Sequence, residues 1–390
     1  MRRRFAEVAE RLRDTGSAKW AVHVRAREMQ RGGADVIELT IGEPDHLPDP
    51  SLIEVAEKAM RAGRVRYSSG QGEPELIEAL VERYRRRRPD VSGDNVLCFP
   101  GTQTALFATI MGLTGEGDGV LVGDPFYATY EGVIRASGAH PVSVPLRPEH
   151  GFRMQPDDLE AAIAPDCRAL LLNTPHNPSG AVLDAAAVAA IGDVCRRHDL
   201  WLVCDEVYEE LVFDGRFASP FDDPAFADRT IVLSSISKSC AAPGFRSGWA
   251  IGPADFSEAV LPLSEAMLFG NQPFIADMTA FALRHPPDTA RRMREDYQRR
   301  ASLIVERLTA TRSIRPFMPK AGMFVLADVS ETGLDDEAFA WALLEAGVAV
   351  MPGSSFGTNA ADLIRLSLTL PDEKIERACD RIAHFAETLS

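Results

Sequence analysis

Short apolar, β-branched runs alternate with helical patterns through the middle of this 390-residue chain, and this alternation constrains the fold more than any other feature. Strands that are apolar on both faces, with helices between them, are typical of a mainly parallel sheet covered on both sides. We therefore predict an α/β protein whose large domain holds a mainly parallel seven-stranded sheet. The runs expected to form strands are residues 95–99, 119–124, 140–146, 168–173, 200–206, 230–235 and 247–252.

The pattern changes from about residue 284. A long charged helix is expected over residues 288–310, and the segments 322–329 and 364–369 are expected to be strands of a smaller α+β domain. We expect the N-terminal residues to pack with this C-terminal part. The predicted domains are residues 46–285 for the large domain, and residues 1–45 together with 286–390 for the small domain.

Composition excludes several classes of partner. The formal net charge is −15, which argues against nucleic acid and anionic membranes. No apolar run reaches the ~18 residues that would span a bilayer. The first 14 residues carry charges throughout and lack the apolar core of a signal peptide, so we expect a cytoplasmic protein. The six cysteines form no CxxC or CxxH pair, so no metal site is expected.

Ligands of open parallel sheets bind outside the carboxyl ends of the strands, so the residues after each run are candidates for a site. "PGTQTA" follows residues 95–99 and opens a helix, which would suit a phosphate but is also an ordinary helix start. Asn177 lies in a proline-flanked turn, either as a turn residue or as a rigidly held amide. Asp205 ends an apolar strand and needs a cationic partner, which is either an arginine or a protonated nitrogen of a ligand.

The stretch from Thr230 to Ala254 contains no Asp or Glu, although the chain has 57 of them, and it carries Lys238 and Arg246. Desolvation and a second cation nearby both lower the pKa of a lysine, and a lysine with a lowered pKa forms Schiff bases. The alternative is a surface loop with two solvated cations. A lysine for an aldehyde, Arg246 and serines for a phosphate, and Asp205 for a ring nitrogen together describe one cofactor, pyridoxal phosphate.

The same segments carry a resemblance to a known family over essentially the whole chain. The chain resembles the class I/II, fold type I pyridoxal-phosphate aminotransferases, which implies transfer of an amino group from an L-amino acid to a 2-oxo acid. Each motif alone is degenerate, but eight in this order and spacing are specific. They are "IGEPD" (41–45), "YSSGQGEPELIEAL" (67–80), "PGTQTALF" (100–107), "DPFYATY" (124–130), "NTPHNPSG" (173–180), "DEVYEEL" (205–211), "SISKSCAAPGFRSGW" (235–249) and "IRLSL" (364–368).

The resemblance also implies roles for individual residues. Lys238 would be the Schiff-base lysine and the proton shuttle, and Asp205 would pair with the pyridine nitrogen. Tyr208 and Asn177 would hydrogen-bond the phenolic oxygen of the cofactor, and Tyr127 would stack on its ring.

Further implied roles concern the two anionic ends of the site. Tyr67 would reach the phosphate of the neighbouring subunit, so the active unit would be a homodimer with shared active sites. The other phosphate ligands would be Gly101, Thr102, Gln103, Ser235 and Arg246. The substrate α-carboxylate would be bound by Arg365, with help from Asn177 and the backbone of Gly42.

The substrate is less constrained. Several details resemble arginine–pyruvate transaminases, which suggests a guanidino or other basic amino acid as donor and an oxo acid such as pyruvate or 2-oxoglutarate as acceptor. Gln103 stands where dicarboxylate-specific relatives have a lysine, which argues against aspartate. Glu43 and Asp45 are candidates for reading a cationic side chain, although both also suit turn or cap positions, and Trp20 is a candidate lid residue by analogy.

Several alternatives stay open at this point. They are an aspartate- or aromatic-type aminotransferase, an aminotransferase for a modified arginine such as enduracididine, and a β-lyase or decarboxylase on the same scaffold. The chain departs from many relatives at Pro243, Phe245 and His46, near the expected substrate mouth. A nicotinamide-binding enzyme is disfavoured because "PGTQTA" is not the GxGxxG fingerprint.

Overall fold

The computed structural model describes residues 5–13, 15, 17–268 and 270–389. Of the N-terminal segment whose charges argued against a signal peptide, residues 1–4 and Asp14 lie outside this description. Within the described residues, no helix has both the length and the apolar character needed to cross a bilayer. The same residues contain no group of His, Cys, Asp and Glu side chains that could hold a metal ion.

Seven strands form one large sheet, in the order β2-β8-β7-β6-β5-β3-β4. Neighbouring strands from β7 to β4 pair in parallel, whereas β8 is antiparallel to both β2 and β7. The predicted mainly parallel seven-stranded sheet is therefore confirmed. The strands are β2 (Val96–Phe99), β3 (Gly119–Asp124), β4 (His140–Pro145), β5 (Cys167–Asn173), β6 (Trp201–Asp205), β7 (Thr230–Ser235) and β8 (Gly248–Ile251).

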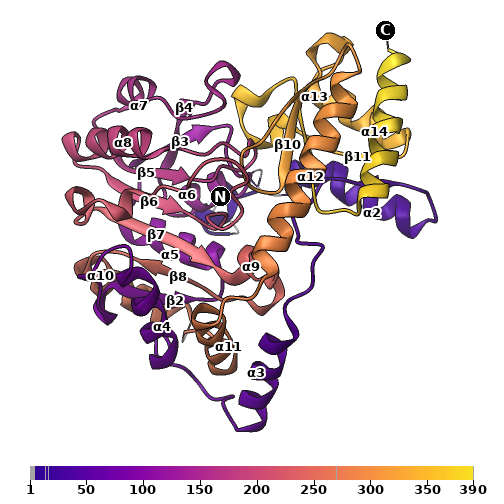
Figure 1. Cartoon of the computed structure of the whole chain (residues 1–390). Helices are drawn as coiled ribbons and strands as arrows, with labels where there is room; N and C mark the ends of the chain where they lie inside the picture. Colours follow the sequence, from indigo (N-terminus) through magenta and orange to yellow (C-terminus); the bar gives the residue numbers. More distant parts are fainter. Residues whose placement is uncertain (1–4, 14, 16, 269, 390) are drawn as a thin grey trace.

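Helices cover both faces of the large sheet (Figure 1). α5, α6 and α10 pack on one face, while α7 and α8, together with α3, α4 and α11, pack on the other. Their bounds are α3 (Pro50–Arg61), α4 (Pro74–Arg85), α5 (Thr102–Leu113), α6 (Tyr130–Ala136), α7 (Pro156–Ala162), α8 (Ala185–Arg197), α10 (Ala254–Met267) and α11 (Pro273–Arg284).

Coverage on both faces explains the continuous apolar runs of the strands. In β6, Val203 packs against the helices of one face, while Leu202 and Cys204 pack against those of the other. β3 divides in the same way, with Val122 on the first face and Leu121 on the second. Successive side chains of a strand point to opposite faces, so a sheet between two helical layers requires apolar residues at consecutive positions.

A smaller domain follows, built on a four-stranded antiparallel sheet in the order β12-β13-β10-β9. The N-terminal segment joins this domain, because β1 (Ile37–Glu38) pairs in parallel with β11 (Val348–Ala349). Figure 1 shows its helices grouped apart from the large sheet. Its elements are α2 (Ala21–Arg31), α12 (Thr289–Thr309), α13 (Asp336–Glu345), α14 (Asp372–Glu387), β9 (Arg315–Phe317), β10 (Phe324–Asp328), β12 (Met351–Pro352) and β13 (Leu363–Ser367).

α12 is the long charged helix predicted over residues 288–310. It buries Met293, Tyr297, Ala301, Ile304 and Leu308 on one side, at the three- and four-residue spacing of a helical stripe. Its charged residues therefore lie mainly on the solvent side, which explains why a helix rich in arginine and glutamate belongs to the core of this domain. The described residues also include the short α-helices α1 (Glu7–Arg11) and α9 (Ile236–Ser239).

The carboxyl ends of the central strands bring polar residues together at one edge of the large sheet. Asn173 at the end of β5 lies opposite Asp205 at the end of β6, and Ser235 ends β7. α9, which carries Lys238, follows Ser235 directly. The carboxyl-end rule used for the sequence therefore selects the correct edge.

Candidate active site

A cavity of about 280 Å³ lies at this edge, with walls from both domains. Arg365 of β13 and Phe324 of β10 come from the small domain, and Lys238 and Asp205 come from the large one. The structure brings most of the predicted site residues into its lining. These are Gly42, Thr102, Gln103, Tyr127, Asn177, Asp205, Tyr208, Ser235, Lys238, Arg246 and Arg365.

Lys238 extends from the one-turn helix α9, whose first residue is preceded by Ser235 as the N-cap. Its Nζ donates to the Gly42 carbonyl oxygen at 2.5 Å. Burial lowers the pKa of Lys238 to about 8, and the nearby cations Arg365 and Arg246 act in the same direction. The predicted lowering of this pKa is confirmed, but the amine is not free of carboxylates, because Glu43 and Asp205 from other segments oppose the lowering.

Asp205 is buried and has a pKa raised above its usual value by desolvation. Its Oδ2 accepts a 2.6 Å hydrogen bond from the Tyr130 hydroxyl, and its Oδ1 accepts from the Val207 backbone N–H at 3.3 Å. These hydrogen bonds favour the ionised carboxyl. Asp205 makes no ion pair within the described residues. A protonated nitrogen of a ligand would supply the cationic partner that its buried charge requires.

Sequence reasoning missed Tyr130, although a signal for it was present. Tyr130 is the last residue of the quoted segment "DPFYATY" and stands three positions after Tyr127. The two rings form an edge-to-face pair with centroids 5.5 Å apart. Three positions correspond to about one helical turn, so both tyrosines could have been expected to point to the same side.

Asn173 was also missed, and it connects several site residues. Its Nδ2 donates to the Asp205 carbonyl oxygen at 3.0 Å, and its Oδ1 accepts from the Asn177 N–H at 2.7 Å. The side chain of Asn177 in turn accepts from Arg365 and is hydrogen-bonded to Tyr208. The side-chain amides of Asn173 and Asn177 thus connect the ends of β5 and β6 to the turn after β5 and to the small domain.

The opposite end of the cavity is shaped for an anion. α5 begins at Thr102, where the first backbone N–H groups of a helix have no partner within the helix. The Thr102 Oγ1 is buried and has no hydrogen-bond partner within the described part of the chain. Arg246 lies against Gly101, where an added Cβ would come within 2.4 Å of its Nη2. A phosphate would satisfy the orphaned hydroxyl, the helix terminus and the guanidinium together.

Gly248 permits the close approach on which this anion site depends. A Cβ at Gly248 would lie 2.6 Å from the carbonyl carbon of Gly101 and 2.7 Å from the Thr102 backbone nitrogen. Both are backbone atoms that cannot move aside without shifting the start of α5. A side chain at this position would therefore displace the helix terminus.

Arg365 is 1% exposed and makes no ion pair with the residues that the structure describes. It donates to Thr40 O at 2.6 Å and to Asn177 Oδ1 at 3.1 Å, while its Nε has no partner in the same residues. The guanidinium lies between the rings of Phe324 and Phe356, 3.8 and 4.3 Å from their centroids. Arg365 is therefore a buried cation without a counterion, and a carboxylate of a ligand would supply one.

Some predicted residues lie elsewhere. Tyr67 is 91% exposed and does not line the cavity of its own protomer. Asp45 does not reach the cavity as a reader of the substrate side chain, because it pairs with Arg300 at 2.9 Å. Glu43 lies outside the lining as well, whereas Trp20 belongs to it. His46, expected near the substrate mouth, pairs instead with Asp296 at 2.9 Å.

This geometry agrees with the comparison to known proteins. The sequence profile of aminotransferase class I and II matches residues 34–382. The chain belongs to this family of fold type I enzymes, whose cofactor is pyridoxal phosphate. It is therefore a pyridoxal-phosphate-dependent aminotransferase.

Among individual relatives, the arginine–pyruvate transaminase AruH of Pseudomonas aeruginosa is 42% identical over 388 residues, which cover 99% of each chain. The aspartate/prephenate aminotransferase of Thermus thermophilus is 34% identical over 371 residues, or 94% of this chain and 95% of that one. The solved structure of aspartate aminotransferase from Thermus thermophilus with maleate has a TM-score of 0.92 at 33% identity, over 98% of this chain and 100% of that chain.

Proposed function

We propose that the cavity binds pyridoxal phosphate with Lys238 at the aldehyde, Asp205 at the ring nitrogen and the start of α5 at the phosphate. The supporting observation is a set of polar groups in the cavity, whose chemistry corresponds to the ring nitrogen, the phosphate and the aldehyde of this cofactor. Within the described residues, buried Asp205 makes no ion pair and Thr102 Oγ1 has no hydrogen-bond partner, and Lys238 is an amine whose pKa is lowered to about 8. Ser235, Arg246, Gly101 and Gln103 complete the phosphate end. Tyr208 and Asn177 bind the phenolic oxygen, and Tyr127 stacks on the ring.

The remaining groups bind the substrate and move its proton. Arg365 offers two N–H groups to the α-carboxylate, and Asn177 and the Gly42 backbone assist it. The bound cofactor supplies an electron sink that makes the substrate α-proton acidic. Lys238, whose pKa is lowered to about 8, would serve in its neutral form as the base that takes this proton from the substrate Cα and as the group that carries it. Asp205 would pair as a carboxylate with the ring nitrogen, and the Tyr130 hydrogen bond favours this ionised form against the effect of burial.

We further propose a donor with a basic side chain and an acceptor such as pyruvate. The described lining contains three cations, Lys238, Arg246 and Arg365, and each already has a partner in the roles above. The second carboxylate of a substrate such as aspartate would therefore find no unassigned cation in the described lining. Trp20 gives the lining an uncharged aromatic side chain on which a guanidinium can stack. The likeness to an arginine–pyruvate transaminase supports the same donor class.

A substrate screen tests this proposal. Single L-amino acids are added to the cofactor-loaded enzyme, and the visible absorbance of the cofactor is followed before pyruvate or 2-oxoglutarate is supplied. We expect the fastest change with arginine or a related basic amino acid, and turnover with pyruvate. A preference for aspartate would overturn the donor class, and release of ammonia in place of amino transfer would indicate a lyase.

We also propose a homodimer in which Tyr67 completes the site of the partner. Large apolar side chains are exposed along the same part of the chain, among them Leu47 at 84% and Tyr67 at 91%. Such residues suit an interface between two copies.

The free thiols of all six cysteines support a cytoplasmic location. We retain residues 46–285 as the large domain and residues 1–45 with 286–390 as the small one.

A further inference from the structure

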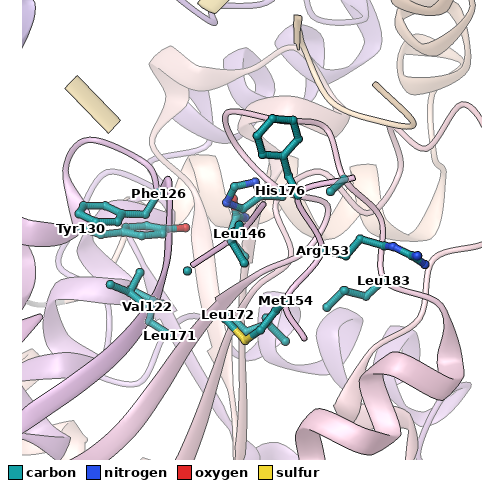
Figure 2. A pocket seen from close by; sticks show the side chains of 14 residues that line it. Val122, Phe126, Tyr130, Leu146, Arg153, Met154, Leu171, Leu172, His176 and Leu183 are labelled. Atoms are coloured by element: carbon teal, nitrogen blue, oxygen red, sulfur yellow. The ribbon is translucent and has the colours of Figure 1, made fainter. Parts of the chain in front are cut away.

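His176 is a buried histidine that no step above uses, although it directly precedes Asn177. It lines a second, much smaller cavity of about 20 Å³, which Figure 2 shows from close by. Tyr130 and Asn173 line both cavities, so His176 lies behind a wall of the active site. A space of this size holds about one water molecule, so the cavity itself is no ligand site. The position of the imidazole is the informative feature.

The two ring nitrogens of His176 have different partners. Nε2 lies 3.0 Å from the Pro125 carbonyl oxygen, and Nδ1 lies 2.7 Å from Ser179 Oγ. A carbonyl oxygen only accepts, so Nε2 carries the proton and donates it, while Nδ1 accepts from the Ser179 hydroxyl. Burial lowers the pKa of His176 to about 4, so the ring is neutral near pH 7.

The Nδ1 contact belongs to the turn that carries Asn177. Ser179 Oγ also accepts from the Ala181 N–H at 3.2 Å. Within the same turn, the His176 N–H donates to Ala181 O at 3.0 Å, and the Gly180 N–H donates to His176 O at 2.8 Å. The turn therefore has its own backbone hydrogen bonds, and Ser179 is not the sole group that holds it closed.

The Nε2 contact reaches a different segment, which carries Tyr127. Pro125 follows β3 directly, and Tyr127 lies two residues further along. The next residue, Phe126, donates its N–H to Phe356 O at 2.7 Å, but this bond leads to the small domain. The imidazole of His176 thus joins the Pro125–Tyr127 segment to the turn that presents Asn177.

We propose that His176 is a positioning residue that fixes Tyr127 relative to Asn177 through its hydrogen bond to Pro125. The inference rests on the roles proposed above for Tyr127 and Asn177. His176 touches neither substrate nor cofactor, and it acts through these two residues. Without this hydrogen bond, His176 no longer positions the ring of Tyr127 relative to Asn177 and its hydrogen bond with Arg365.

Two amide substitutions separate the two contacts of the ring. His176→Gln places an N–H donor at the position of Nε2, so it keeps the contact to Pro125 and loses the one to Ser179. His176→Asn places its amide at the position of Nδ1 and keeps only the contact to Ser179. We expect His176→Asn to raise both the dissociation constant of pyridoxal phosphate and the KM for the amino donor about tenfold, and to weaken the circular dichroism of the bound cofactor. His176→Gln should stay within about threefold of the wild type.

The comparison of the two variants decides the proposal, with thermal unfolding of each protein as the control for folding. His176→Phe, which fills the same space without a donor, should behave like His176→Asn. Equal behaviour of the Gln and Asn variants, or better function of His176→Asn, would overturn the inference, because the turn alone would then account for the histidine. Failure of the wild type to bind pyridoxal phosphate would instead overturn the proposed cofactor site.

Discussion

The Tyr130 hydroxyl donates a 2.6 Å hydrogen bond to Oδ2 of Asp205, and both side chains are buried. Burial raises the pKa of Asp205, whereas this hydrogen bond lowers it. The tyrosine therefore helps to keep the carboxyl ionised in a place where desolvation favours its neutral form.

Tyr130→Phe should move the acid limb of activity to higher pH. The catalytic step needs the Asp205 carboxylate, so activity is present above the pKa of Asp205 and is lost as the pH falls through it. Removing the hydrogen bond raises that pKa, and the measured profile of kcat/KM against pH should shift upward with it. Tyr84→Phe is the control, because Tyr84 is a buried tyrosine that partners Trp249, 2.8 Å away, outside the cavity. An unchanged acid limb in Tyr130→Phe would contradict the role of Tyr130.

Arg365→Lys should weaken substrate binding without weakening cofactor binding. Lysine keeps the charge but loses the planar pair of N–H groups that a carboxylate accepts. We expect kcat/KM for the amino donor to fall about 10- to 100-fold, mainly through KM. The dissociation constant of pyridoxal phosphate, measured on the same preparation, should stay close to that of the wild type. A variant that loses the cofactor while keeping its KM would contradict this assignment.

Gly248→Ala should weaken cofactor binding by displacing the start of α5. The added methyl would lie 2.6 Å from Gly101 C and 2.7 Å from Thr102 N. Overpacking of this kind costs about 1–3 kcal/mol, so the dissociation constant of pyridoxal phosphate should rise about 5- to 150-fold. Gly244→Ala is a matched control from the same loop, since no described atom beyond Gly244 and its two chain neighbours lies within 4 Å of the place that its added methyl would take. Equal cofactor affinity in both variants would argue against a phosphate site at this helix terminus.

A hybrid dimer tests whether Tyr67 acts across the subunit interface. One subunit carries Lys238→Ala with its own Tyr67, and the other carries Tyr67→Phe with its own Lys238. If Tyr67 serves the partner, the hybrid contains one intact site with the wild-type KM and about half of the wild-type rate per dimer. If Tyr67 serves its own subunit, the only site with Lys238 also carries Tyr67→Phe, and the KM matches the Tyr67→Phe homodimer.

Sequence patterns were sufficient to predict the strands of the large sheet, because each strand has a local pattern of its own in the sequence. Residues 119–124 and 230–235 each contain a short apolar run, and β3 and β7 have these same bounds. The carboxyl-end rule then brought Asp205, Asn177 and Lys238 to one edge before any contact was known. Strands β1, β11 and β12 have two residues each, which is too few to show a period, so no local pattern marks them as strands.

The surroundings of Arg365 could not be derived from the sequence, because they are assembled from distant segments. Thr40 and Phe324 reach the guanidinium from opposite ends of the chain. The pairing of Asp45, a candidate for reading a cationic side chain, could not be derived for a related reason. Asp45 suited that role by its distance in sequence from Gly42, but Arg300 of α12 takes its charge. Pairing across about 250 residues leaves no local pattern.

Covalent labelling of Lys238 tests the central claim most directly. The protein is loaded with pyridoxal phosphate, the bond between amine and aldehyde is fixed by borohydride reduction, and the digested peptides are sequenced by mass spectrometry. We predict a pyridoxyl group on Lys238 and none on the other lysines, with no label when Lys238→Ala is treated in the same way. A label on a different lysine, or a protein that takes up no cofactor, would contradict the account.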